Sequence, residues 1–351
     1  MVKYLSCTVL VFLCCTVLGV QLNIDFAGKV PTGHIQGADF NGQHLYIAFT
    51  ANLFKCDMTG KILKKTGFPK IDGIAGKDIK SQQLRMQNNI TRPHFGDLCF
   101  ADGKIFVAFS GSGFNRELNG GNSYNYIFEY DTDLNLLKRH HVPIMQYGVG
   151  GITFANGSFY VVGGRPDGVT GNTVYVFDRS FKAVSTRELP FNSFKGIQTI
   201  SYNNGKFFIG CYGWRELSWV LNENFQIVSV HNLDFSKGII HQADGKLSYC
   251  FYEHRNKDKK ITKVSVFPVN LEKFKVKTLE LNITEDGKFI TDNKSVSKEK
   301  LCLLFKEMRR KNGIVFINIP SSVSGKAVAD AVLLAQQNKL DFHVLVKKND
   351  I

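Results

Sequence analysis

Five short turns recur along this chain, and they constrain its fold more than any other feature. They are Asn41-Gly42, Asp102-Gly103, Asn156-Gly157, Asn204-Gly205 and Asp244-Gly245. Asn-Gly and Asp-Gly favour two-residue hairpins, because both central residues of a type I′ turn need positive φ. An apolar strand such as "KIFVAFS" (104–110) or "KFFIGCY" (206–212) follows each turn. We therefore predict five antiparallel hairpins.

Two further strands follow the hairpin in each unit, as in "NTVYVFD" (172–178) and "KAVSTRELP" (182–190). Four antiparallel strands in units of about 40–60 residues are typical of a β-propeller. The predicted blades span 32–68, 95–143, 147–190, 194–234 and 237–281, with "KVKTLEL" (275–281) as the last strand of blade five. The early strand "QLNIDFA" (21–27) should pair into the last blade and close the ring, which removes exposed sheet edges. Residues 69–94 form a long insertion between the first two blades.

The hydrophobic period changes after Leu281. In "SKEKLCLLFKEMRRK" (297–311), Leu301, Leu304, Phe305 and Met308 recur at helical spacing, and Ser297 is a suitable N-cap. The strand "GIVFINIP" (313–320), the helix "SGKAVADAVLLAQQNK" (324–339) and the strand "FHVLVKK" (342–348) complete the chain. We therefore predict a mainly β protein, with a five-bladed β-propeller over 20–281 and a small α+β domain over 282–351.

The C-terminal part, residues 278–347, resembles the periplasmic domain of the TolR/ExbD family of biopolymer-transport proteins. The matching residues are Asp286, Gly287, Phe289, Val296, Leu301, Leu304, Phe305, Val315, Ile317, Gly325, Lys326, Val328, Val332, Phe342 and Val344. The resemblance implies a bacterial cell envelope, docking to an envelope transport complex or the cell wall, and a possible homodimer through this domain. Family members carry a membrane helix with an embedded Asp before the domain. A propeller stands there in this chain, so we expect binding without the motor role.

Residues 1–19 read as a signal peptide, because Lys3 precedes an apolar run that ends in the small residue Gly19. The alternative is a membrane anchor, since residues 5–20 approach the length needed to span a bilayer. Both readings predict a periplasmic or secreted protein, and the second adds membrane association at the N-terminus. The formal net charge of +14 favours envelope proteins or an anionic cell-wall or glycan ligand as partner. Export argues against nucleic acid.

Eight cysteines are present, and three of them lie in the signal segment. The other five are Cys56, Cys99, Cys211, Cys250 and Cys302. Their wide spacing predicts buried thiols in place of a disulfide framework, with one bridge, Cys211–Cys250, left open. Metal-ligand spacing and nucleotide-binding motifs are absent from the sequence, so we expect no metal and no cofactor. The "GVGG" stretch (148–151) opens a strand and predicts close packing.

An arginine occurs in the loop after the second strand of four blades, and we predict that these loops form a ligand-binding site. The predicted ligand-binding residues are Arg116, Arg165, Trp214, Arg215 and Arg255. Guanidinium groups around one mouth would favour a carboxylate or phosphate, and Trp214 could stack on a sugar ring. The competing interpretation is that nearby acids, such as Glu253 beside Arg255, simply pair with the arginines.

Asp39 and Asp97 are the candidate catalytic residues of an alternative function, a secreted glycan-active hydrolase. Both lie on predicted innermost strands, and such an enzyme needs two channel carboxylates about 5–10 Å apart. The competing interpretation is that they bond to backbone groups or to His34 and His94. We therefore expect a non-catalytic bacterial envelope binding protein, with the propeller as a platform and the C-terminal domain for docking.

Overall fold

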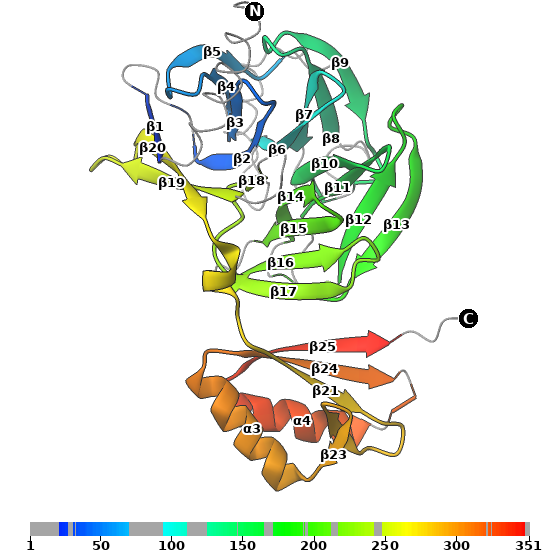
Figure 1. Ribbon diagram of the computed structural model, residues 1–351. Coiled ribbons are helices and arrows are strands. Elements are labelled where there is room, and N and C mark those ends of the chain that lie inside the picture. Colours follow the sequence, from blue (N-terminus) through cyan, green and yellow to red (C-terminus); the bar gives the residue numbers. More distant parts are fainter. Residues whose placement is uncertain are drawn as a thin grey trace, which may run out of the picture.

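The computed structural model describes residues 21–26, 31, 33–69, 94–110, 125–145, 147–164, 171–191, 193, 196–211, 217–241, 248–320, 322–323 and 325–347. Five four-stranded antiparallel sheets surround a common centre, and a mixed sheet with two α-helices follows them (Figure 1). The predicted five-bladed β-propeller is therefore confirmed. No helix among the described residues is long and apolar enough to cross a membrane. Residues 1–19, predicted as a signal peptide or anchor, lie outside the described part of the chain.

The first four blades are each built from four consecutive strands, ordered from the centre outward. Blade one has β2 (Ile35–Phe40), β3 (Leu45–Phe49), β4 (Asn52–Cys56) and β5 (Ile62–Gly67). Blade two has β6 (His94–Ala101), β7 (Lys104–Ser110), β8 (Asn125–Tyr130) and β9 (Leu136–His141). Blade three has β10 (Gly151–Ala155), β11 (Ser158–Val162), β12 (Asn172–Phe177) and β13 (Ala183–Leu189). Blade four has β14 (Ile197–Asn203), β15 (Lys206–Cys211), β16 (Leu217–Asn222) and β17 (Ile227–Asn232). Most of the predicted 69–94 insertion lies outside the described residues.

Blade five closes the ring with a strand from the other end of the propeller. Its strands are β18 (Ile240–His241), β19 (Ser248–Arg255), β20 (Ile261–Val269) and β1 (Leu22–Asp25). β1 pairs antiparallel with β20, with Leu22 opposite Val266, as predicted. The predicted last strand of this blade, 275–281, was wrong. That segment pairs with the C-terminal sheet instead, because Leu281 and Ile283 pack with the apolar residues of the helices there.

Turn chemistry repeats around the ring. Positive φ at both turn residues is found in the Asp102-Gly103, Asn156-Gly157 and Asn204-Gly205 hairpins, as predicted, whereas Asn41-Gly42 has it only at Gly42. Between the third and fourth strands of blades one to four, and between the second and third strands of blade five, an Asx side chain accepts the backbone N–H groups two and four residues later. These residues are Asp57, Asp131, Asp178, Asn222 and Asn256.

Glycines let the inner strands approach one another at the centre. A Cβ on Gly96 would overlap the backbone of Gly150, and one on Gly150 would overlap the carbonyl oxygen of Ile197. These contacts join blades two, three and four through backbone atoms. The packing role predicted for the "GVGG" stretch is therefore confirmed. The Cys211–Cys250 bridge that the sequence left open does not form, because Cys250 is a buried free thiol.

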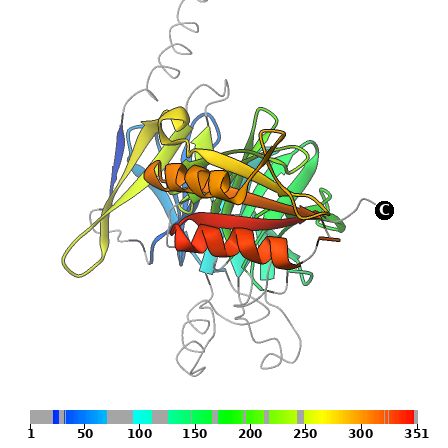
Figure 2. The ribbon, with the colours of Figure 1, turned by 90° about the horizontal axis from the view of Figure 1, so that it is seen from below.

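The C-terminal unit is a five-stranded sheet in the order β23-β22-β21-β24-β25, preceded by a short 3-10 helix. Its elements are η2 (Leu271–Phe274), β21 (Thr278–Ile283), β22 (Phe289–Thr291), β23 (Lys294–Val296), α3 (Lys298–Arg310), β24 (Ile314–Pro320), α4 (Gly325–Gln337) and β25 (Asp341–Lys347). Ser297 caps α3 as predicted, since its side chain accepts a hydrogen bond from Lys300 N. Viewed from below, α3 and α4 lie side by side over the sheet (Figure 2).

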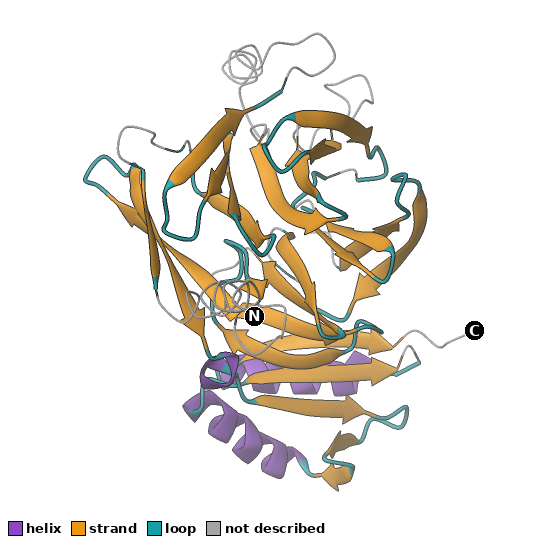
Figure 3. Ribbon diagram, turned by 45° about the horizontal axis from the view of Figure 1, so that its top comes forward, coloured by secondary structure: helices purple, strands orange, loops and turns teal. Residues whose placement is uncertain are grey.

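The sheet of this unit is covered on both faces. Val315 and Ile317 of β24 pack with Leu301 and Phe305 of α3. The alternate residues Ile314 and Phe316 pack with the core of blade four. This alternation is the strand period of two, which sends successive side chains to opposite faces. Figure 3 shows the resulting order of layers, with the helices on the side of the sheet away from the propeller.

Candidate functional site

The connection between blade five and the C-terminal unit crosses the edge of blade four. After η2 the chain is extended at Lys275. Val276 N donates to Val230 O of β17 at 2.7 Å, and Ile314 N of β24 donates to Lys277 O at 3.0 Å. Hydrogen bonds from both sides therefore fix this segment, because each backbone group that bonds to a neighbouring strand restrains the chain there.

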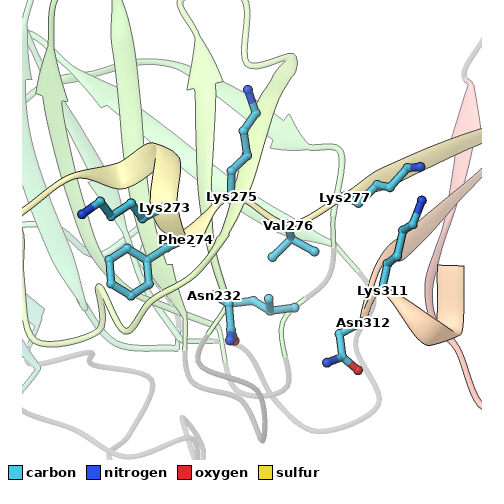
Figure 4. A pocket seen from close by; sticks show the side chains of 9 residues that line it. Asn232, Lys273, Phe274, Lys275, Val276, Lys277, Lys311 and Asn312 are labelled. Atoms are coloured by element: carbon cyan, nitrogen blue, oxygen red, sulfur yellow. The ribbon is translucent and has the colours of Figure 1, made fainter.

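A cleft of about 250 Å³ lies along this fixed segment. Its lining combines four lysines with two amides and three apolar side chains: Leu217, Asn232, Lys273, Phe274, Lys275, Val276, Lys277, Lys311 and Asn312. Figure 4 shows the amines of Lys277 and Lys311 pointing the same way from neighbouring elements. Blade four, the linker and the end of α3 thus each contribute to one basic site, which we call the lysine cleft.

Two carboxylates partly balance the lysines. Glu307 lies 2.5 Å from Lys311 Nζ and 3.4 Å from Lys277 Nζ, and Glu272 lies 3.6 Å from Lys275 Nζ. Hydrogen bonds from Lys311 and Lys277 lower the pKa of Glu307, and the bond to Glu307 raises the pKa of Lys311. All these groups are solvent-exposed, so such pairs are weak and exchangeable. Four cations against two anions leave a net positive site that can bind an anion.

Of the five residues predicted to form the arginine site, the structure describes only Arg255. Arg116, Arg165, Trp214 and Arg215 lie outside the described residues. Arg255 is described, and its guanidinium donates to Glu253 Oε2 at 2.6 Å and 3.1 Å. The other oxygen of Glu253 accepts Ile35 N at 2.5 Å. Arg255 therefore takes part in a local ion pair, which is the competing interpretation made from the sequence.

Asp97 is buried, Asp39 is half-buried, and both are hydrogen-bonded to backbone. Asp39 accepts N–H groups from Phe40 at 2.8 Å and from Phe100 of blade two at 2.7 Å. Asp97 accepts Leu98 N at 2.8 Å and Ile200 N of blade four at 3.2 Å. These bonds hold blades together, which is the competing interpretation made from the sequence, with backbone amides as the partners. The two carboxylates therefore serve as hydrogen-bond acceptors that link blades at the centre of the ring.

Burial has an electrostatic consequence that can be measured. Loss of solvation raises the pKa of Asp39 to about 6 and raises that of Asp97 well above its usual range. The folded state therefore holds protons that the unfolded chain releases near pH 4. A raised pKa contributes stability that is present below pH 4 and is lost as the pH rises through 6.

We expect the free energy of unfolding to respond to Asp39 between pH 4 and 7. Ionising this group in the folded state should cost about 3 kcal/mol once the pH exceeds 6. As the pH rises from 4 to 7, the free energy of unfolding of the wild type, measured in urea, should fall relative to that of Asp39→Asn. A difference that stays constant from pH 4 to 7 would contradict the assignment.

The lysine cleft was missed from the sequence. Lys275 and Lys277 lie in the segment predicted as the last propeller strand (275–281), and Lys273 lies just before it in the predicted fifth blade. The alternation of Lys273, Lys275 and Lys277 with Phe274 and Val276 was a signal that one side of this segment is cationic. Lys311 follows α3 and comes close to the others only through the pairing of β21 with β24. Among the described residues, no group of three or more His, Cys, Asp or Glu side chains could hold a metal ion.

Comparisons with known proteins do not assign a family. No protein-family model and no curated protein matches the chain. Among solved structures, it is similar to a protein of unknown function from Bacteroides caccae, with 12% identity, a TM-score of 0.35, and coverage of 72% of this chain and 82% of that one. The Pan2 WD40 domain of Neurospora crassa has 11% identity and a TM-score of 0.32, with coverage of 66% and 62%.

A third solved structure is the subtype N11 neuraminidase-like protein of A/flat-faced bat/Peru/033/2010, with 10% identity and a TM-score of 0.38. The alignment covers 67% of this chain and 73% of that one. Likenesses this distant carry no argument about activity. The class of protein is therefore defined by the chain's own geometry, as a five-bladed β-propeller joined to a two-helix, five-stranded unit with a basic cleft between them.

Proposed function

We propose that this protein is a non-catalytic interaction protein of the cell envelope, and that it binds an anionic partner in the lysine cleft. The observation that carries the proposal is that Lys273, Lys275, Lys277 and Lys311 all line one cavity at the junction of the two folds. Lysines of this kind attract anions over a distance of about one Debye length, roughly 8–10 Å at physiological salt. The propeller then serves as the platform that holds one wall of the site.

The envelope location and the docking role are proposals from the sequence alone. Export would depend on residues 1–19, and the likeness to the TolR/ExbD family rests on the pattern of residues 278–347. A partner in an envelope complex or an anionic cell-wall polymer would both suit a basic cleft. The geometry does not favour a hydrolase, because Asp39 and Asp97 accept hydrogen bonds from backbone amides of other blades.

Charge reversal in the cleft should abolish most anion binding. We expect Lys275→Glu combined with Lys311→Glu to weaken binding of fluorescent poly-L-glutamate at least about tenfold. The two substitutions remove two positive charges and add two negative ones, so the cleft no longer attracts anions. Binding of the wild type should weaken as salt rises, and that of the variant should depend little on salt. Fluorescence anisotropy measures both affinities.

The matched control is the double variant Lys257→Glu with Lys260→Glu, in the turn between β19 and β20. It makes the same change in net charge at exposed lysines outside the cleft. It should keep most of the wild-type affinity. Equal weakening in both double variants would show that binding follows net charge, and the cleft would lose its assigned role.

A further inference from the structure

Strand β21 has an unpaired edge beside the lysine cleft. It pairs with β24 along Thr278–Asn282, but β22 covers its other side only at Asn282 and Ile283. Because Ile314 N bonds to Lys277 O, the parallel register directs the backbone groups of Leu279 and Leu281 toward β24. Those of Thr278 and Glu280 then point to the open side, where no described backbone group bonds to them.

A second cavity, of about 650 Å³, lies along this open edge. It is lined by the strand, the end of α3 and the tip of the β22–β23 hairpin: Lys277, Thr278, Leu279, Glu280, Asn282, Asp292, Asn293, Leu304, Glu307 and Met308. The part of the β21 edge that β22 does not pair with therefore faces a cavity. Two N–H and two C=O groups of the strand are available in it.

The two cavities are lined by adjacent stretches of the chain, and apart from the shared Lys277 their charged side chains are of opposite sign. Lys277 lines both of them. On one side lie the other lysines of the cleft, and on the other side lie Glu280, Asp292 and Glu307. Leu279, Leu304 and Met308 supply apolar surface to the second cavity. A ligand that spans both must be anionic at one end and must offer hydrogen-bonding groups, apolar atoms and a cation at the other.

We propose that an extended polypeptide segment binds here by adding a short strand to the open edge of β21, with an acidic run over the lysines. This inference rests on the proposed function for its acidic end. Backbone groups two residues apart in a strand repeat at about 6.6–6.8 Å, which is the spacing that Thr278 and Glu280 present. Strand addition supplies affinity through such bonds, while side-chain pockets supply specificity. The lining of the second cavity contains no aromatic ring on which a sugar could stack.

The test uses a fluorescent peptide, Asp-Glu-Asp-Glu-Thr-Val-Thr-Val-Thr-Lys, and the full chain. A second peptide carries N-methyl groups on both valines, which keeps its charge and removes two backbone donors. We expect the first peptide to bind at least about tenfold more tightly than the N-methylated one. Thr278→Pro, which removes one edge N–H, should reduce this preference, and poly-L-glutamate binding by the same variant should be unchanged.

The outcomes separate this inference from the proposed function. Equal affinity of the two peptides for the wild type overturns strand addition, whatever Thr278→Pro does to folding. If, in addition, both peptides lose binding to the variant with Lys275→Glu and Lys311→Glu, the lysine cleft remains an anion-binding site and the edge of β21 has no part in it. A heparin-derived octasaccharide that binds more tightly than the first peptide overturns the polypeptide as occupant. Failure of every anion to bind the wild type removes the proposed function as well.

Discussion

Replacing Gly96 with alanine should destabilise the folded protein by about 3 kcal/mol or more. The new Cβ would overlap the carbonyl oxygen of Gly150 and press on the backbone of Val149. These are backbone atoms of the neighbouring blade, so relief requires the inner strands β6 and β10 to move apart. Such a displacement would disturb the packing of the whole ring, because interiors are close-packed and transmit strain.

Urea or thermal unfolding measures this effect, and Gly325→Ala is the matched control. A Cβ on Gly325, the first residue of α4, meets nothing within 4 Å. Alanine there should be neutral or stabilise by up to about 1 kcal/mol, because it reduces the freedom of the unfolded chain. Similar stability for Gly96→Ala and wild type would mean that the blades are not held this closely.

Replacing Trp219 with alanine should release the C-terminal unit from the propeller. Trp219 is 2% exposed and stacks on Phe191 of blade three, with ring centroids 4.3 Å apart. Its ring also meets Phe316 at 5.9 Å and His343 at 5.0 Å, both in the C-terminal sheet. Truncating a buried tryptophan costs about 3–5 kcal/mol, and here part of that loss falls on the contact between the two units.

We expect unfolding of Trp219→Ala to show two transitions and limited proteolysis to cut near residues 271–277. The variant Leu333→Ala is the control, since that leucine is 52% exposed on α4. Its stability should stay within about 0.5 kcal/mol of wild type. A single transition of unchanged midpoint in Trp219→Ala would show that the units do not depend on this contact.

The propeller was predictable because its signals are local. An Asn-Gly or Asp-Gly pair specifies a hairpin without reference to the rest of the chain. Four of the five predicted pairs join the first two strands of a blade, and Asp244-Gly245 lies outside the described residues. Even the pairing of β1 with blade five followed from the need to cover sheet edges. The same local turn chemistry recurs at Asp131 and Asp178, and blade four uses Asn222 for it.

The site was not predictable, because it depends on pairings distant in sequence. The segment 275–281 alternates like an outer blade strand, and nothing local distinguishes a blade partner from β24. The pairing of β21 with β24 brings Lys277 close to Lys311, and both lysines form ion pairs with Glu307. The hydrogen bonds of Asp39 with Phe100 and of Asp97 with Ile200 likewise join separate blades, so the sequence could offer only the alternatives.

Hydrogen–deuterium exchange of the full chain, with and without the acidic decapeptide, tests the central claim most directly. We predict slower exchange over residues 271–282 and 304–312, which carry most of the lysine cleft and the open edge of β21. Protection confined to the propeller loops, with exchange of those two segments unchanged by the peptide, would contradict a binding site at the junction.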